Sequence, residues 1–362
     1  MKNNINRRDF LKLGMLSVGG IRLLDHNSEK IFSDIPQADL IGRNCTGGKI
    51  ELKSKPSMNS SSVGTFYEDS LFEWLREVVG EAPAGRYSKR WVETPAGYLY
   101  APFLQPVKNL PNVPVTSIPE TSLGKGMWVE VTVPYVDIFL SQAASSPWLK
   151  ESIRPRLYYQ QVIWVDDVAI NANGEMVYRV NELYGSYGDI YWCDAKAFRP
   201  ITAEEIAPIR PEVTDKRVVV DLNHQTLSCY EGNSEVFYCR ISSGAKFNAA
   251  GEAVDKWSTP LGPHPIWRKL ISIHMSGGTT GGGWDIAGVG WTSLFAGTGV
   301  AVHSTFWHND YGTPRSNGCV NCLPDDAKWI FRWTSPDISL DPGDKTVSMP
   351  GGTIIDVIES LY

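Results

Sequence analysis

Residues 299–321 read Gly-Val-Ala-Val-His-Ser-Thr-Phe-Trp-His-Asn-Asp-Tyr-Gly-Thr-Pro-Arg-Ser-Asn-Gly-Cys-Val-Asn, and the C-terminal fold is organised around them. The β-branched start predicts a strand over 299–302 that ends at His303. A polar loop containing Gly and Pro follows and closes at Cys319. A short helix is predicted from Asp325 to Trp333. The two ends of one loop therefore supply an imidazole and a thiol.

The residue types at the end of this loop suit a nucleophilic cysteine. Gly318 directly precedes Cys319, so the backbone can turn tightly there and direct N–H groups toward the sulfur. A free thiol has a pKa near 8.5 and is only about 3% thiolate at neutral pH. Cys319 therefore needs a base within reach, and His303 is the candidate.

The motif around Cys319 resembles the active-site signature of the YkuD-type L,D-transpeptidases. That signature is a His, a loop, and then Ser or Thr followed by His-Gly-Cys-x-Asn or His-Gly-Cys-x-Arg. Residues 316–321 read Ser-Asn-Gly-Cys-Val-Asn, and His303 lies sixteen residues before Cys319. Further matches are Val220-Asp-Leu222, Thr259-Pro-Leu-Gly262 and the closing strand at 352–358. The resemblance covers residues 216–359.

The resemblance implies a fold and a set of roles. The catalytic domain, residues 216–362, is expected to be a YkuD-like β-sandwich with a short helix. The implied catalytic residues are Cys319 as nucleophile, His303 as general base and acid, the backbone carbonyl of Ser304 to orient His303, and the Gly318 backbone in an oxyanion hole. The candidates for substrate binding are Arg315, Ser316, Asn317 and Asn321.

The implied substrate is a peptidoglycan tetrapeptide stem. Cys319 would form an acyl-enzyme, release D-Ala and transfer the acyl group to an amine of another stem peptide. Water as acceptor would make the protein an L,D-carboxypeptidase, and a decayed site would leave a non-catalytic wall-binding protein. The resemblance implies no cofactor and no metal, and it implies acylation by carbapenem-type inhibitors.

Asn317 departs from the family pattern, because it stands where a second His is usual. An Asn side chain can donate and accept hydrogen bonds but cannot act as a base near neutral pH. If this position only orients substrate or backbone, Asn can serve. If it transfers protons, the activity would be weak or the acceptor altered. We favour the first interpretation, because His303 already supplies a base.

Two other interpretations apply to the same cysteines. Cys319 and Cys322 form a C-x-x-C pair, but a thioredoxin-like site needs it at a helix N-terminus after a βαβ pattern. Together with His303 and His308 they could supply four zinc ligands. The surrounding β-meander and the catalytic motif argue against both. We expect Cys322 to be buried, His308 to be a loop residue, and Asn309 and Asp310 to form a turn.

The N-terminal residues 1–30 resemble a twin-arginine export signal. Arg7-Arg8-Asp9-Phe10-Leu11-Lys12 fits its motif, and a short apolar run follows that is too short for a transmembrane helix. The alternative is a basic, disordered N-terminus. The signal predicts a protein that works in the periplasm or cell-wall space and meets the membrane only during export or through an uncleaved signal.

Two β-rich modules are predicted before the catalytic domain, at residues 40–108 and 126–200, with a polar linker at 201–215. Both contain short strand-like runs broken by Gly and Pro, which is typical of small barrels. Their C-terminal halves, 90–107 and 178–200, share the order strand, Gly turn, aromatic strand, connector and Pro. They resemble bacterial Src-homology-3-like (SH3-like) barrels. Their aromatic residues would form core or a groove for peptide or glycan.

The composition narrows the possible partners. The chain has 362 residues and a formal net charge of −6, which argues against nucleic acid as a partner. The six cysteines are dispersed. Cys229 is expected to face Val236 across a hairpin, so no disulfide with Cys239 is expected. The glycine-dense segment 271–299 would be a mobile cap over the site or a partly disordered insertion.

Overall fold

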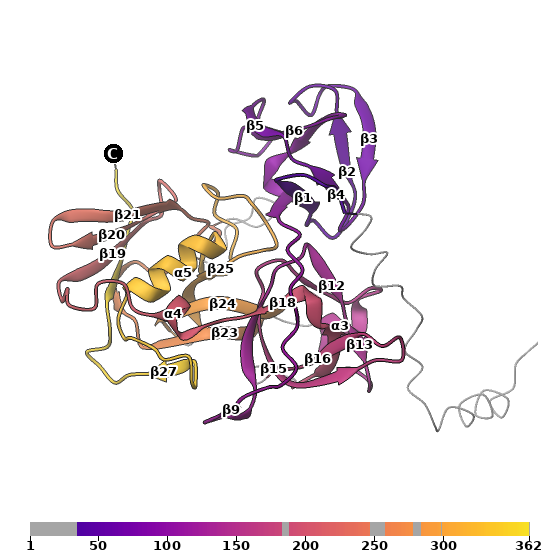
Figure 1. The fold of residues 1–362 in the computed structure, drawn as a ribbon. Helices are drawn as coiled ribbons and strands as arrows, with labels where there is room; N and C mark the ends of the chain where they lie inside the picture. Colours follow the sequence, from indigo (N-terminus) through magenta and orange to yellow (C-terminus); the bar gives the residue numbers. More distant parts are fainter. Residues whose placement is uncertain (1–34, 183–187, 247–257, 278–283, 298, 362) are drawn as a thin grey trace, which may run out of the picture.

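The computed structural model describes residues 35–182, 188–246, 258–277, 284–297 and 299–361 (Figure 1). They form a mostly β protein with short helices, which confirms the predicted fold class. The predicted signal, residues 1–30, lies outside the described residues. Among the described helices, none has the length and apolar character needed to cross a membrane.

The first module lies at the top of Figure 1 and forms two small sheets. Alternating apolar residues, such as Ile50 and Leu52, pack into a core with Val92 and Leu99. Its elements are β1 (Ile41–Asn44), β2 (Ile50–Lys53), β3 (Ser62–Phe66), β4 (Leu71–Glu73), β5 (Arg76–Val79), β6 (Arg90–Thr94), β7 (Gly97–Tyr100), the 3-10 helix η1 (Ala101–Phe103) and β8 (Leu104–Val107).

The second module is built on a six-stranded sheet of order β13-β17-β16-β15-β11-β18. Like the first module, it ends in a strand, a 3-10 turn and a last strand. Its elements are β9 (Glu120–Thr121), β10 (Gly124–Lys125), β11 (Met127–Val131), β12 (Tyr135–Asp137), β13 (Phe139–Leu140), α3 (Pro147–Glu151), β14 (Arg156–Tyr158), β15 (Val162–Ile170), β16 (Met176–Asn181), β17 (Ile190–Asp194), η2 (Ala195–Ala197) and β18 (Phe198–Pro200). An SH3-like relationship for either module stays a prediction.

The segment between the second module and the C-terminal domain contains a short helix, α4 (Ala203–Ile206). Thr202 and Glu205 form a capping box that satisfies free N–H groups at its start. Ile201 and Ile206 are buried in the core of the C-terminal domain. The predicted linker is therefore packed against the domain that it precedes.

The C-terminal domain contains two five-stranded sheets in the described residues, of order β21-β20-β19-β28-β22 and β26-β25-β24-β23-β27. Its elements are β19 (Lys216–Asp221), β20 (Thr226–Glu231), β21 (Ser234–Arg240), β22 (Gly262–Pro265), β23 (Arg268–Gly277), β24 (Trp284–Ala296), β25 (Val300–Ser304), β26 (Val320–Cys322), α5 (Pro324–Trp333), β27 (Asp344–Thr346) and β28 (Ile354–Ile358). The predicted meander, helix and closing strand are all present.

One apolar core joins the two sheets and α5. Val218 and Leu227 of the first sheet share it with Val302 of the second sheet and Phe331 of α5. Trp329 of α5 stacks on a ring of β21 at 4.2 Å between centroids. The helix therefore contacts both sheets.

The hairpin register around Cys229 differs by one residue from the sequence-based prediction. Cys229 lies opposite Phe237, not Val236, because the register shifts between Cys229 and Tyr230. Cys239 lies opposite Leu227, and both thiols are free.

The prediction of a cap or disordered insertion over residues 271–299 is wrong for most of the segment. Its described residues belong mainly to β23 and β24, which form a long antiparallel hairpin. Gly288 and Gly290 allow the second module to approach. A Cβ on Gly288 would lie 2.7 Å from Ile163 Cδ1, and one on Gly290 would lie 2.8 Å from Val162 Cγ2. Gly278 and Gly281 to Gly283 lie outside the described residues.

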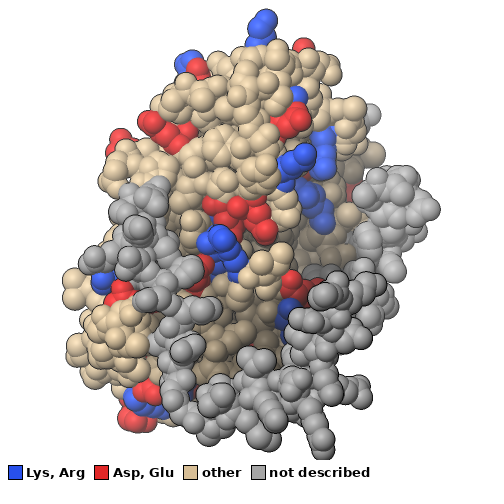
Figure 2. All heavy atoms as spheres, turned by 90° about the vertical axis from the view of Figure 1, so that its right-hand side faces the viewer, with Lys and Arg blue, Asp and Glu red and all other residues tan. Residues whose placement is uncertain are grey.

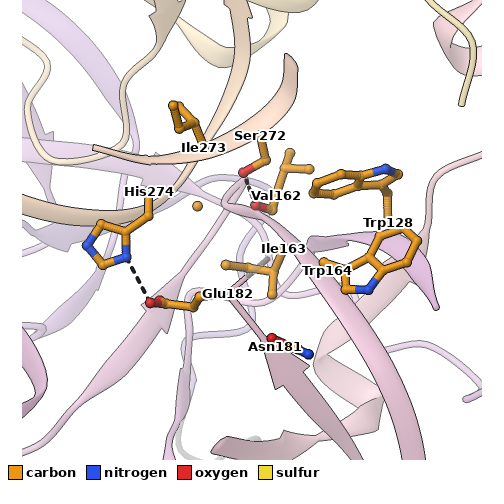
Figure 3. Close-up of a pocket in the computed structure, with 10 residues that line it drawn as sticks. Trp128, Val162, Ile163, Trp164, Asn181, Glu182, Ser272, Ile273 and His274 are labelled. Atoms are coloured by element: carbon orange, nitrogen blue, oxygen red, sulfur yellow. Dashed lines mark hydrogen bonds and ion pairs between the residues drawn. The ribbon is translucent and has the colours of Figure 1, made fainter. Parts of the chain in front are cut away.

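Polar contacts join the second module to β23 and β24 around a small cavity of about 30 Å³ (Figure 3). Ser272 Oγ donates to the Val162 carbonyl at 2.5 Å. His274 lies between Glu182 of the second module, at 2.8 Å, and Asp285 of β24. A cavity of this size is much too small for a peptide substrate.

The side of the molecule on the right of Figure 1 carries charges of both signs. Figure 2 shows acidic and basic side chains interspersed there among a larger area of other residues. Among the described residues visible on this face, basic side chains are mixed with acidic ones and form no broad basic area.

Candidate active site

The two ends of the loop meet because β25 and β26 pair in parallel. His303 lies opposite Asn321, and Val302 lies opposite Val320. Val302 and Val320 point into the core shared with α5. Side chains alternate between the faces of a strand, so His303, Asn321 and Cys319 lie on the other face. The structure therefore brings the predicted imidazole and thiol to one side of one sheet.

His303 is held as a neutral ring in one tautomer. It is 2% exposed, and burial lowers its pKa to about 4, against a smaller opposing effect of a backbone hydrogen bond. Its Nδ1 lies 2.8 Å from the Ser304 carbonyl oxygen. A carbonyl only accepts, so Nδ1 carries the proton. Nε2 is left with a lone pair and can accept a proton.

Cys319 is half-buried and packs beside Leu270, Leu294 and Ala301. Burial raises the pKa of its thiol to about 11, although a hydrogen bond with the Ala301 backbone opposes the shift. Its Sγ lies 3.5 Å from the Gly299 carbonyl oxygen, to which the thiol donates. At neutral pH the resting pair is therefore an uncharged thiol and an uncharged imidazole.

The turn before Cys319 is fixed by hydroxyl groups. Gly318 has φ 119°, which favours glycine. Its N–H donates to Ser316 Oγ at 3.1 Å, and Ser316 Oγ donates to the Cys319 carbonyl at 2.5 Å. Thr259 Oγ1 donates to the Gly318 carbonyl at 2.9 Å. The Gly318 N–H, the donor implied for the oxyanion hole, is thus already engaged by Ser316. The neighbouring N–H of Cys319 is the alternative backbone donor.

The other two candidate substrate residues lie on the surface of this turn. Asn317 is exposed at the bend. Arg315 is one-third exposed and forms an ion pair of 3.3 Å with Asp310, which is 1% exposed. Its guanidinium is therefore already opposite a carboxylate inside the protein. From the sequence, Asp310 is expected only to form a turn; in the structure it is also the buried partner of Arg315 in an ion pair.

The loop between His303 and Cys319 is also held by the first module. Arg43 donates to the Phe306 carbonyl at 3.3 Å, and Arg90 donates to the Asn309 carbonyl at 3.2 Å. Asn309 N donates to the Pro102 carbonyl at 3.2 Å. The first module is therefore attached directly to the backbone of the candidate active-site loop.

The zinc interpretation does not fit this arrangement. Cys322 points into the core shared with α5, on the opposite face of β26 from Asn321 and the thiol of Cys319. The two cysteines cannot converge on one ion. Within the described residues no group of three or more His, Cys, Asp or Glu side chains is placed to hold a metal.

Several residues of the site were missed by the sequence analysis. In the sequence, Thr259 stands out only as part of a motif, and His308 only as a loop residue. His308 is buried, and its Nε2 lies 2.9 Å from the Asn321 side-chain amide. Arg43 and Arg90 lie more than 200 residues before Phe306 and Asn309, so no local pattern connects them.

The fold and site define a β-sandwich domain with a buried imidazole and a thiol on one face of a sheet. Residues 215–353, which contain both groups, match the family model described as YkuD, L,D-transpeptidase catalytic domain. This part of the chain is therefore assigned to the YkuD catalytic domain, as predicted. A search of curated proteins found no match.

Solved L,D-transpeptidase structures show low overall similarity to the chain. An Enterococcus faecium L,D-transpeptidase is 22% identical, with a TM-score of 0.30, over 41% of this chain and 51% of that chain. The Mycobacterium smegmatis L,D-transpeptidase is 16% identical, with a TM-score of 0.31, over 62% of this chain and 99% of that chain. The match thus spans about half the length of the Enterococcus faecium protein.

Proposed function

We propose that this protein is a cysteine L,D-transpeptidase that acts on peptidoglycan stem peptides outside the inner membrane. One observation carries the proposal: a neutral His303, with Nδ1 held by Ser304 and a free lone pair on Nε2, shares a sheet face with Cys319. The family match supports the reaction class, and the export-like segment 1–30 supports the location.

Acylation begins with an uncharged pair. As the Cys319 sulfur attacks the carbonyl carbon of the third stem residue, His303 Nε2 takes the thiol proton. The carbonyl oxygen becomes an oxyanion, for which the Cys319 N–H is a donor; one such donor contributes about 3–4 kcal/mol in the transition state. The C–N bond then breaks, and His303 returns the proton to the amine of the departing D-Ala.

Transfer reverses the roles of the groups. An amine of a second stem peptide attacks the thioester carbon and gives a proton to His303. The C–S bond breaks, and the proton returns to the sulfur, so the enzyme is restored. Because the His303 ring begins and ends neutral, the same group serves as base and acid in both halves of the reaction.

The reaction is tested by incubating the purified protein with disaccharide-tetrapeptide fragments and analysing the products by mass spectrometry. The proposal predicts a cross-linked dimer together with free D-Ala. A tripeptide without dimer would identify an L,D-carboxypeptidase. No product with the wild-type protein, as with a Cys319→Ala control, would favour a non-catalytic wall-binding protein.

Inhibitor binding gives a second readout of the same site. We propose that carbapenem-type compounds acylate Cys319, as the family resemblance implies. One solved structure of a similar protein, the Mycobacterium tuberculosis L,D-transpeptidase 3, is in complex with a faropenem-derived adduct. The two proteins are 15% identical, with a TM-score of 0.30, over 55% of this chain and 91% of the Mycobacterium tuberculosis chain.

A further inference from the structure

His308 is a second imidazole in the candidate active site. It comes from the middle of the loop and is only 6% exposed. Its ring lies 5.5 Å from that of Tyr311, whose hydroxyl donates to the Thr305 and Cys322 carbonyls at 3.2 Å. The loop that carries His308 is therefore fixed to β26 and to the end of β25.

The surroundings of His308 determine its tautomer. Burial, and then the charge of Arg315, lower its pKa to about 3, so the ring is neutral at physiological pH. The backbone N–H of Asp310 donates to its Nδ1 at 3.2 Å. A neutral imidazole has one N–H and one acceptor nitrogen. The proton of His308 is therefore on Nε2.

This tautomer sets the orientation of the Asn321 amide. The amide nitrogen position lies 2.9 Å from His308 Nε2, so two donors would face each other. The amide oxygen position is buried and has no partner among the residues that the structure describes. Turning the amide group by 180° lets Oδ1 accept the Nε2 proton. The NH2 group then occupies the unpartnered position.

Asn321 lies opposite His303 and on the same face as Cys319, from which it is separated by one residue. Asn321 is 2% exposed, so after this turn its NH2 group is a buried donor for which the described residues offer no acceptor. We propose that His308 is a positioning residue, which fixes the Asn321 amide so that its NH2 group, and not its oxygen, is presented to the carbonyl of the bound acyl group. This inference rests on the proposed function.

The second imidazole of this site is thus supplied by His308, from the middle of the loop. Position 317, where the family pattern has a second His, holds an exposed Asn. The supporting contacts explain why His308 stays in place. The Asp310 side chain pairs with Arg315 at 3.3 Å and with Arg86 of the first module at 3.7 Å. The residue that fixes the ring of His308 is therefore itself held from two sides.

The tautomers are tested by nitrogen NMR of the full protein labelled in histidine, which needs no substrate. We expect a neutral His308 with its proton on Nε2 and a neutral His303 with its proton on Nδ1, both unchanged between pH 5 and 8. A His308 ring protonated on Nδ1, or charged in this range, would overturn the proposal. Because no activity is measured, this result does not depend on the proposed function.

The positioning role is tested by the rate at which a carbapenem acylates Cys319, followed by intact-protein mass spectrometry. We expect His308→Ala to lower the maximal acylation rate at least tenfold with little change in the half-saturating concentration. His308→Gln, whose amide can donate to Asn321, should recover most of the rate. His264→Ala is the control, because the ring of His264 bonds the nearby backbone carbonyls of Pro260 and Leu261.

A double-mutant cycle separates positioning from a general loss of structure. Asn321→Asp keeps the acceptor for His308 but removes the amide donor. If His308 acts through Asn321, the double variant should be no slower than the slower single variant. Additive losses, an unchanged rate in His308→Ala, or a Gln variant as slow as the Ala variant would overturn the proposal. Failure of the wild-type protein to be acylated would instead overturn the proposed function.

Discussion

At Cys319 and His303, burial decides the charge of the resting site. It raises the pKa of the thiol to about 11 and lowers the pKa of the imidazole to about 4. Proton transfer from sulfur to nitrogen is therefore unfavourable before substrate binds. It becomes coupled to the formation of the bond between sulfur and the acyl carbon, which is the step that general base catalysis assists.

This resting state predicts the pH dependence of alkylation at Cys319. A thiol with a raised pKa is protonated below that pKa, so its thiolate fraction rises about tenfold per pH unit up to about pH 11. The rate of labelling by iodoacetamide, measured by peptide mapping, should therefore increase from pH 7 to pH 10 without a plateau. Cys45, also half-buried with a pKa raised to about 11, is an internal reference.

A plateau near neutral pH that disappears in His303→Ala would contradict this prediction, since it would reveal a preformed thiolate–imidazolium pair. The roles of Cys319 and His303 follow from their residue types and from the motif. Their resting charges could not be predicted in this way. The pKa of the Cys319 thiol, for example, depends on its burial beside Leu270, Leu294 and Ala301, which lie on other strands.

At the scale of elements, the strands of the C-terminal domain could be predicted because their apolar residues alternate and turn residues separate them. The long hairpin of β23 and β24 could not. From the sequence alone, its glycines suggest a disordered segment. In the structure, two of them, Gly288 and Gly290, leave room for the second module to pack against β24. Gly288 has φ 66°, and a Cβ there would lie 3.1 Å from the Val162 carbonyl oxygen.

Gly288→Ala should therefore destabilise the protein by about 1–3 kcal/mol, since it adds backbone strain to a steric overlap with Ile163. The measurement is the free energy of unfolding from urea denaturation followed by tryptophan fluorescence. Gly48→Ala is the matched control, because a Cβ at Gly48 meets no atom within 4 Å. Equal stability of the two variants would show that β24 does not need this close approach.

At the scale of the whole molecule, Arg43 connects all three parts of the described chain. Its guanidinium pairs with Asp69 of the first module at 2.6 Å and lies 3.9 Å from the Tyr158 ring of the second module. It also donates to the Phe306 carbonyl of the active-site loop. The sequence gives no sign of this role, because each of these partners comes from a distant segment.

Arg43→Ala should lower stability by about 1–3 kcal/mol, because it removes one of the two arginines that pair with the buried Asp69, while Arg156 still pairs with it at 2.9 Å. It should also slow acylation of Cys319, because the loop loses one of its attachments. Calorimetry and intact-protein mass spectrometry measure the two effects. Arg76→Ala is the control, since Arg76 is 71% exposed and pairs with Glu93 within the first module. An effect no larger than that of the control would rule out the connecting role.

Acylation of Cys319 by a stem peptide is the central event of the proposed reaction. The measurement is peptide mapping by mass spectrometry of the protein quenched in acid during turnover with a tetrapeptide fragment. We predict a thioester of the tripeptide acyl group on Cys319, formed at least about 100-fold more slowly in His303→Ala. Turnover without any adduct on Cys319, or an adduct that forms equally fast without His303, would contradict it.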